Sequence, residues 1–149
     1  MTVFEQQLNE FFQDIFNDIL ILENQSLSNG KFYNLSVNEM HVISAVCDCD
    51  KKGENTMKKL SEKLKITAGS LTISVKTLEQ KGYLIRLKDN DDKRKVFVFP
   101  TELGKQANNH HEQFHNNLVT HILSAVSESE ISVLIPALSA LHRFFTTLI

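Results

Sequence analysis

Apolar residues recur at three- and four-residue steps along most of the chain, which predicts a mainly helical protein. In the first stretch, residues 3–27, the apolar stripe is wider than one side of a helix: Phe4, Leu8, Phe11, Phe12, Ile15, Phe16, Ile19, Leu20, Leu22 and Leu27. A single neighbouring helix cannot cover a stripe of this width. The pattern therefore indicates burial of the first helix between two subunits.

Residues that favour helix N-termini precede each of the later helical stretches. Serine and threonine at such a position accept a hydrogen bond from a backbone N–H of the first turn, and a glutamate three residues on completes a capping box. The predicted N-caps are Ser36 (with Glu39), Thr56, Thr67, Thr101 and Ser127 (with Glu130).

The expected ends of these helices follow from turn residues. The short helix after Thr56 ends at a turn, Lys65–Ile66, and the next helix runs from Thr67 to about Lys81, where Gly82 suits a C-terminal stop. The helix after Thr101 is long, over about residues 102–126. The last apolar stretch, residues 131–149, is expected to be interrupted at Pro136.

Two strands are predicted between residues 83 and 100. Residues 83–88 alternate Leu84, Arg86 and Lys88 with Ile85 and Leu87, a half-buried pattern. Residues 89–95 form a turn because aspartate and asparagine favour turns. Residues 96–99 form the return strand, and Pro100 ends the ladder.

Length and composition fit one domain over residues 1–149, with 42% apolar residues and a net charge of −2. There is no apolar run of the ~18 residues that a membrane span needs, and the first ten residues lack the features of a signal peptide. We therefore expect a cytoplasmic protein. Cys47 and Cys49 are too few for a disulfide framework, which fits a reducing compartment.

The small net charge hides an asymmetry. Residues 51–105 contain fourteen Lys or Arg and seven Asp or Glu, a charge of +7, whereas the rest of the chain contains two basic and eleven acidic residues, a charge of −9. A basic middle between acidic flanks favours a segment that meets a polyanion.

A short helix, a tight turn and a second helix with a small polar outer face are typical of a helix-turn-helix. In the second helix the inner stripe is Leu71, Val75 and Leu78. The outer positions must be small enough to approach base edges in the major groove, and lysine can reach phosphate. The candidate DNA-binding residues are Thr67, Gly69, Ser70, Thr72, Ile73, Lys76 and Thr77.

The turn between the two strands carries Lys93, Arg94 and Lys95, which is typical of a wing. An arginine on a thin hairpin can enter the minor groove, where the potential is most negative at narrow A·T tracts. Bare aspartates would be repelled there, so we expect Asp92 to brace the guanidinium of Arg94.

The segment DNDDKRKVFVFPTELG resembles the wing signature of MarR-type regulators, roughly D-P-x-D-x-R followed by a strand and L-T-x-x-G. The matching residues are Asp89, Asp92, Arg94, Thr101 and Gly104. Asn90 stands where proline is common, and Pro100 where leucine is common. LEQKGYLIR at residues 78–86 is also similar to the family's passage from recognition helix to wing.

This resemblance implies a winged helix-turn-helix lobe at residues 36–101 and dimerisation helices at residues 1–35 and 102–149. It also implies a homodimeric repressor that binds double-stranded DNA at a pseudo-palindromic operator. IFNDILILENQSL and LSVNEMHVI further resemble the fatty-acid-synthesis repressors of Gram-positive cocci. That branch implies, as co-repressor, a long-chain acyl group on acyl carrier protein.

Three histidines leave an alternative open. His111 and His115 are four residues apart on one predicted helix, a spacing that suits a metal ion, and the fold could bring His41 near them. The zinc-responsive MarR branch has histidines at similar positions. The alternative to a metal site is that these histidines are polar residues that line an effector pocket or form an interdomain hydrogen-bond cluster.

The sequence also bears on whether the protein is an enzyme or a redox switch. The chain has no Gly-rich phosphate loop, nucleophile elbow or HExxH motif, so we expect no enzyme. A redox switch through Cys47 is disfavoured because the family's peroxide sensors carry their reactive cysteine near the chain start. The alternative to a DNA-binding regulator is a helical interaction module that does not bind DNA.

Overall fold

The computed structural model describes residues 1–149 and is mainly helical, with one two-stranded sheet, as the sequence predicts. The elements are α1 (Val3–Ser28), α2 (Val37–Lys51), α3 (Met57–Leu64), α4 (Ala68–Gln80), β1 (Leu84–Lys88), β2 (Val96–Pro100), α5 (Glu102–Ala125) and α6 (Glu128–Thr146). They form two compact units, Met1–Glu112 and Gln113–Ile149, with the boundary inside α5.

The predicted helix starts are confirmed. Ser36, Thr56, Thr67 and Ser127 are N-caps whose hydroxyls accept a backbone N–H, and Ser36 and Ser127 have complete capping boxes. Thr101 receives the N–H of Gly104 at 3.2 Å. Capping depends on residues within one turn, so a local pattern is enough to predict it.

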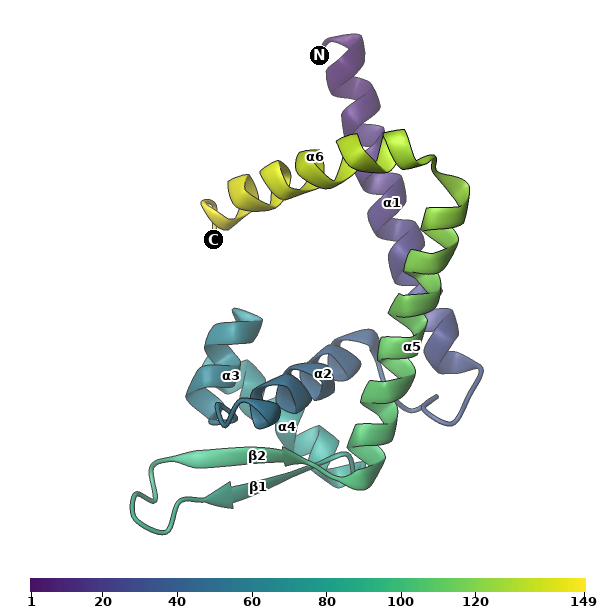
Figure 1. Cartoon of the computed structure of the whole chain (residues 1–149). Coiled ribbons are helices and arrows are strands. Elements are labelled where there is room, and N and C mark those ends of the chain that lie inside the picture. The colour runs from purple at the N-terminus through teal and green to yellow at the C-terminus, as the bar shows by residue number, and fades with distance from the viewer. The chain divides into compact units, whose positions relative to one another are not determined.

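The core of the first unit lies between α2, α3, α4 and the sheet (Figure 1). The inner stripe of α4, namely Leu71, Val75 and Leu78, is fully buried. α2 supplies the largest share of the core because its apolar residues face both α3–α4 and β2. The best buried members outside α4 are Met40, Ile43, Val46, Leu60, Tyr83, Leu84 and Val98.

The turn between α3 and α4 is tight because Lys65 adopts the left-handed conformation, with φ +54°. Its N–H and that of Ile66 return to the carbonyls of Glu62 and Ser61, which closes the end of α3. Gly82 has φ +87° and reverses the chain between α4 and β1. Glycine adopts this conformation without steric cost.

The hairpin is antiparallel, with Leu84 opposite Pro100 and Lys88 opposite Val96. The middle of β2 is anchored to the loop before α3. The amide of Asn55 donates to Val98 O at 2.8 Å, Val98 N donates to Asn55 O at 2.9 Å, and Thr56 forms a single bridge with Phe97. β2 is therefore the inner strand and β1 the open edge.

The half-buried pattern of β1 is confirmed, and the core lies on the side of Leu84. Ile85 and Leu87 point to the other side and stay exposed, opposite Phe99 and Phe97 of β2. A strand alternates its side chains, so burial of Leu84 necessarily turns its two neighbours outward.

The expected interruption at Pro136 is wrong, because α6 continues unbroken from Glu128 to Thr146. A proline inside a helix removes one backbone donor, here the one that would reach the carbonyl of Ser132. The capping box at Ser127 and the long run of helical residues on both sides outweigh that loss.

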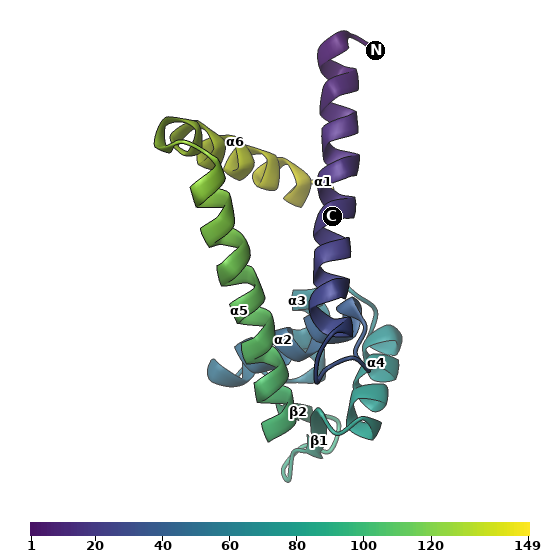
Figure 2. The same ribbon diagram turned by 90° about the vertical axis from the view of Figure 1, so that its right-hand side faces the viewer.

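Much apolar surface is exposed on the helices outside the lobe. The first half of α1 extends beyond the lobe (Figure 2). In the whole of α1 only Glu23 and Leu27, both in its second half, are buried. In the second unit α6 has no buried residue. The helices combine apolar and polar faces, and none has the length and apolar character that a membrane crossing requires.

Candidate nucleic-acid interface

The outer face of α4 is open to solvent. Ile73 lies about 200° around the helix from buried Leu71, at 3.6 residues per turn, and is therefore at the centre of this face. Its side chain is 69% exposed. Gly69, one turn earlier, has open space where a β-carbon would stand. The other predicted DNA-binding residues of α4 are exposed too, except for Thr77, which is half-buried.

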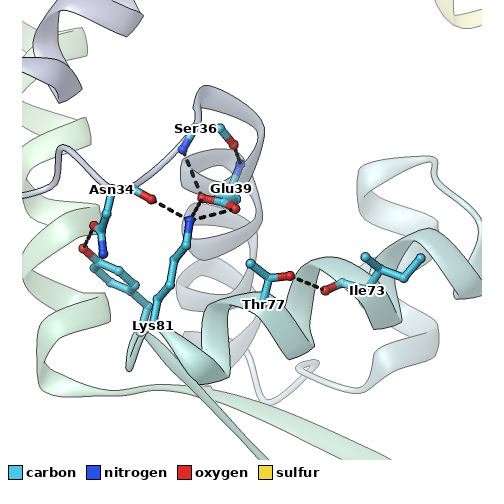
Figure 3. A network of polar contacts seen from close by, with 7 residues as sticks. Asn34, Ser36, Glu39, Ile73, Thr77 and Lys81 are labelled. Carbon is cyan, nitrogen blue, oxygen red and sulfur yellow. Dashed lines mark hydrogen bonds and ion pairs between the residues drawn. The ribbon is translucent and has the colours of Figure 1, made fainter.

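The hydroxyl groups on α4 are partly committed to their own helix. Thr67 accepts Ser70 N at 3.1 Å as the N-cap and donates to Ser70 Oγ at 3.0 Å. Thr72 donates to Ala68 O at 2.8 Å. Thr77 donates to Ile73 O at 3.0 Å (Figure 3). The two threonines therefore offer an approaching molecule a methyl group and an acceptor oxygen.

At the wing tip, Asp92 Oδ1 accepts both Arg94 N at 3.1 Å and Arg94 Nε at 3.2 Å. The side chain of Asp89 accepts Asp91 N, and its backbone N–H donates to Lys95 O. The aspartates thus build the turn and hold the arginine. Arg94 is 93% exposed, so its remaining donors point away from the protein.

A hollow of about 250 Å³ lies between the wing tip and the start of α3. Its lining brings Lys58 of α3 together with Arg94 and Lys95 of the wing. Lys58 was not among the candidates from the sequence, because only the fold places the first turn of α3 beside the hairpin.

Arg86 and Lys81, although basic, are not free for DNA. Arg86 of β1 donates from Nε and Nη2 to the two carboxylate oxygens of Glu79, at 3.0 and 3.1 Å. This two-pronged geometry is typical of strong arginine–carboxylate pairs. Because Glu79 is on α4, the pair ties the wing to α4.

Lys81, just after α4, is held by the start of α2 (Figure 3). Its Nζ donates to Glu39 Oε2 at 2.8 Å and to Asn34 O at 2.5 Å. The hydroxyl of Tyr83 donates to Asn34 Oδ1 at 2.7 Å, and burial raises the pKa of Tyr83. The C-terminal end of α4 is therefore fixed on two sides, by α2 and by the wing.

The first unit brings two of the three candidate histidines together. His41 Nε2 lies 3.4 Å from Glu23 Oε1, and the rings of His41 and His111 are 5.5 Å apart, edge to face. Glu39, the capping glutamate of α2, pairs with Lys81 instead. His115 lies one turn beyond His111 on α5 and belongs to the second unit.

Both cysteines are buried in α2 and unpaired. Burial raises the pKa of the Cys47 thiol from 9.0 to about 11, so the thiol stays protonated at neutral pH. A protonated thiol is a poor nucleophile, which disfavours a redox role.

Comparison with known proteins agrees with this geometry. The MarR family pattern matches residues 36–96. FabT of Streptococcus pneumoniae, solved in complex with DNA, is 33% identical, covers 97% of this chain and 99% of its own, and superposes with a TM-score of 0.90. The MepR–DNA complex of S. aureus has a TM-score of 0.77 at 17% identity, over 91% of this chain and 96% of its own, which shows the fold alone.

Among curated proteins, the HTH-type transcriptional regulator SarZ of Staphylococcus epidermidis is 35% identical over 79 residues, 53% of this chain and 51% of that protein. The chain thus spans about half the length of the curated relatives it matches. The full-length likeness to FabT and the family match over the lobe together settle the family. The chain belongs to the MarR family, whose members are DNA-binding transcriptional regulators rather than enzymes.

Proposed function

We propose that the chain is a homodimeric repressor that binds a pseudo-palindromic operator with α4 in the major groove. The observation that carries the proposal is the exposed outer face of α4, on which Gly69, Ser70 and Thr72 leave room for base edges. Lys76 on the same face can reach a phosphate.

The wing supports the same placement. Arg94 is exposed and oriented by Asp92, so a guanidinium is presented at the end of a thin hairpin. Lys93 and Lys95 flank it and Lys58 lies across the hollow, which makes this end of the lobe basic. Basic side chains at the lobe surface would replace the counterions of the DNA backbone.

The dimer follows from the exposed apolar surface. Phe4, Phe11 and Phe16 on α1 and Val133 and Ile135 on α6 are more than half exposed in the single chain. Apolar surface on this scale marks an interface, and a two-fold dimer would present two recognition helices to two half-sites one helical turn apart.

Salt dependence tests the proposal. The purified protein selects a duplex from a random pool, and binding to that duplex is followed by gel shift from low to high salt. We expect affinity to fall steeply, because phosphate contacts release counterions. If no duplex is enriched, the alternative of a helical interaction module that does not bind DNA replaces this proposal.

We further propose that the regulated genes serve fatty-acid synthesis and that the effector is a long-chain acyl group on acyl carrier protein. The support is the resemblance in residues 15–27 and 35–43 and the full-length likeness to FabT. The test adds acyl-loaded or unloaded carrier protein to the DNA complex. A change in affinity that requires the acyl chain supports the proposal, and equal effects of both forms contradict it.

A zinc-responsive regulator is the second candidate, favoured by the contact between Glu23 and His41 and the nearby ring of His111. One carboxylate and two imidazoles fit the ligand preferences of zinc. DNA binding measured with zinc, and with zinc plus a chelator, decides between the two. Affinity that does not respond to the chelator removes this candidate.

A further inference from the structure

Ile73 stands out among the outer residues of α4 because it is the one large apolar side chain there. It is 69% exposed at the centre of the face, opposite the buried stripe. It does not belong to the buried core of the lobe. An apolar side chain at this position has one natural counterpart in the major groove, the 5-methyl group of thymine.

The surroundings of Ile73 favour the same base pair. Gly69, one turn before it, adds no side chain and leaves open space, so the helix can come close to the bases there. Thr72 and Thr77 donate their hydroxyl hydrogens to Ala68 O and Ile73 O. Their oxygens are left as acceptors.

An A·T pair presents in the major groove a methyl group and an N6 amino donor, whereas a G·C pair presents no methyl group. The outer face of α4 offers the apolar side chain of Ile73 together with the acceptor oxygens of Thr72 and Thr77, which is complementary to the A·T pattern. Ser70 differs, because its Oγ accepts from Thr67 and its own hydrogen remains to be donated.

We propose that Ile73 is a specificity-determining residue that contacts the 5-methyl group of a thymine in each half-site. This inference rests on the proposed function, because it requires α4 to enter the major groove. It assigns to the half-site a thymine at the position that faces the middle of α4.

The test removes the methyl group and nothing else. In the duplex selected by the wild-type protein, each thymine is replaced in turn, symmetrically in both half-sites, by deoxyuridine. We expect one position at which wild-type affinity falls about fourfold per half-site, which corresponds to the ~0.8 kcal/mol of one buried methyl-sized group. In Ile73→Ala the same replacement has no effect, because the partner of the methyl group is already gone.

Ile85→Ala is the matched control. Ile85 is also an exposed isoleucine of the lobe, but it lies on the outer face of the wing. This variant keeps the wild-type response to deoxyuridine. Ile73→Ala remains folded, since the side chain is exposed and alanine favours helix, and its unfolding curve checks this.

Three results overturn the inference: no deoxyuridine position affects the wild type, the affected position responds equally in Ile73→Ala, or the selected half-sites lack thymine. In each of these cases the wild-type protein still binds DNA. Failure of the proposed function itself is different, because no duplex is then selected at all.

Discussion

Arg86 and Glu79 join the wing to the recognition helix through two parallel hydrogen bonds of 3.0 and 3.1 Å. The two side chains are only about one-third exposed, so neither is presented to a ligand as a free charge. We therefore expect this pair to affect DNA binding only by fixing the position of the wing relative to α4.

We expect Arg86→Ala and Glu79→Ala each to lower DNA affinity about fivefold, since a partly shielded pair contributes on the order of 1 kcal/mol. The slope of log affinity against log salt stays at the wild-type value, because no phosphate contact is lost. The exchanged pair Glu79→Arg with Arg86→Glu restores most of the affinity. A direct phosphate contact by Arg86 would give the opposite signs: a shallower slope for Arg86→Ala and tighter binding for Glu79→Ala.

Arg94→Ala tests the wing tip. We expect DNA affinity to fall while the dimer stays intact. The slope of log affinity against log salt becomes smaller by about one for each wing, as for a lost phosphate or groove contact. Gel shift across salt and analytical ultracentrifugation measure the two properties. Lys31→Ala removes the same charge outside the lobe and leaves the DNA affinity and its salt dependence unchanged. Unaltered DNA affinity of Arg94→Ala would show that the wing is misassigned.

Asp92→Ala separates the charge of Arg94 from its orientation. The variant gains net positive charge near the DNA, so simple electrostatics predicts tighter binding. Because Asp92 Oδ1 holds both the backbone and the side chain of Arg94, we expect weaker binding instead. Titration of the selected duplex at fixed salt distinguishes the two signs.

We expect alanine substitution at Gly104 and at Gly69 to change the free energy of unfolding in opposite directions. A β-carbon at Gly104 would overlap the carbonyl oxygen of Tyr83, where α5 begins against the lobe. We expect Gly104→Ala to lower the free energy of unfolding by about 1–3 kcal/mol, as overpacking does. Gly69→Ala meets open space in a helix, so it raises stability by up to about 1 kcal/mol while weakening DNA binding. Urea unfolding and gel shift of both variants check this pair of expectations.

Glu39 has two tasks, capping α2 through the backbone of Ser36 and holding Lys81. We expect Glu39→Ala to lower the free energy of unfolding by about 2 kcal/mol, because a cap and a partly buried charged hydrogen bond are both lost. Glu130→Ala removes a similar capping glutamate that has no lysine partner, and it serves as the control. Equal losses in the two variants would mean that the contact with Lys81 contributes nothing.

Cys47 gives a pH dependence of stability. Its folded-state pKa of about 11 lies above the ordinary value of 9.0, so the unfolded chain loses the thiol proton first as pH rises. The contribution of this group to stability is complete below pH 9 and is lost between about pH 9 and 11. We expect Cys47→Ala to unfold with a weaker pH dependence in that window, as measured by urea unfolding. Rapid labelling of the native thiol at pH 8 by a disulfide reagent would contradict the buried state.

The elements and their N-terminal caps could be predicted from the sequence because each depends on neighbours within one turn. The same holds for Asp92 and Arg94, which are two residues apart. The partners of Lys81 and Arg86 could not be predicted in this way. Glu39 is forty-two positions from Lys81 in the sequence. Glu79 is seven positions from Arg86, and the chain reverses direction between them. A lysine-rich sequence alone does not tell which charges are already neutralised.

The continuity of α6 through Pro136 was missed for a related reason. A proline weakens a helix by a fixed local cost, and whether the helix breaks depends on the residues around it. The face of β1 that meets the core is likewise set by the register with β2 and by Leu84, not by the alternation itself.

The open edge of β1 has a consequence for the protein in the absence of DNA. β2 is covered on its inner side by the bridge at Thr56, but β1 leaves its outer backbone groups unpaired, with Ile85 and Leu87 exposed between them. Such an edge can pair with the same edge of another copy. Lys88 and the basic wing tip repel a second copy, and salt screens that repulsion. We therefore expect high salt to act in two ways on this protein. It weakens DNA binding, and it favours self-association of wings that are no longer bound to DNA.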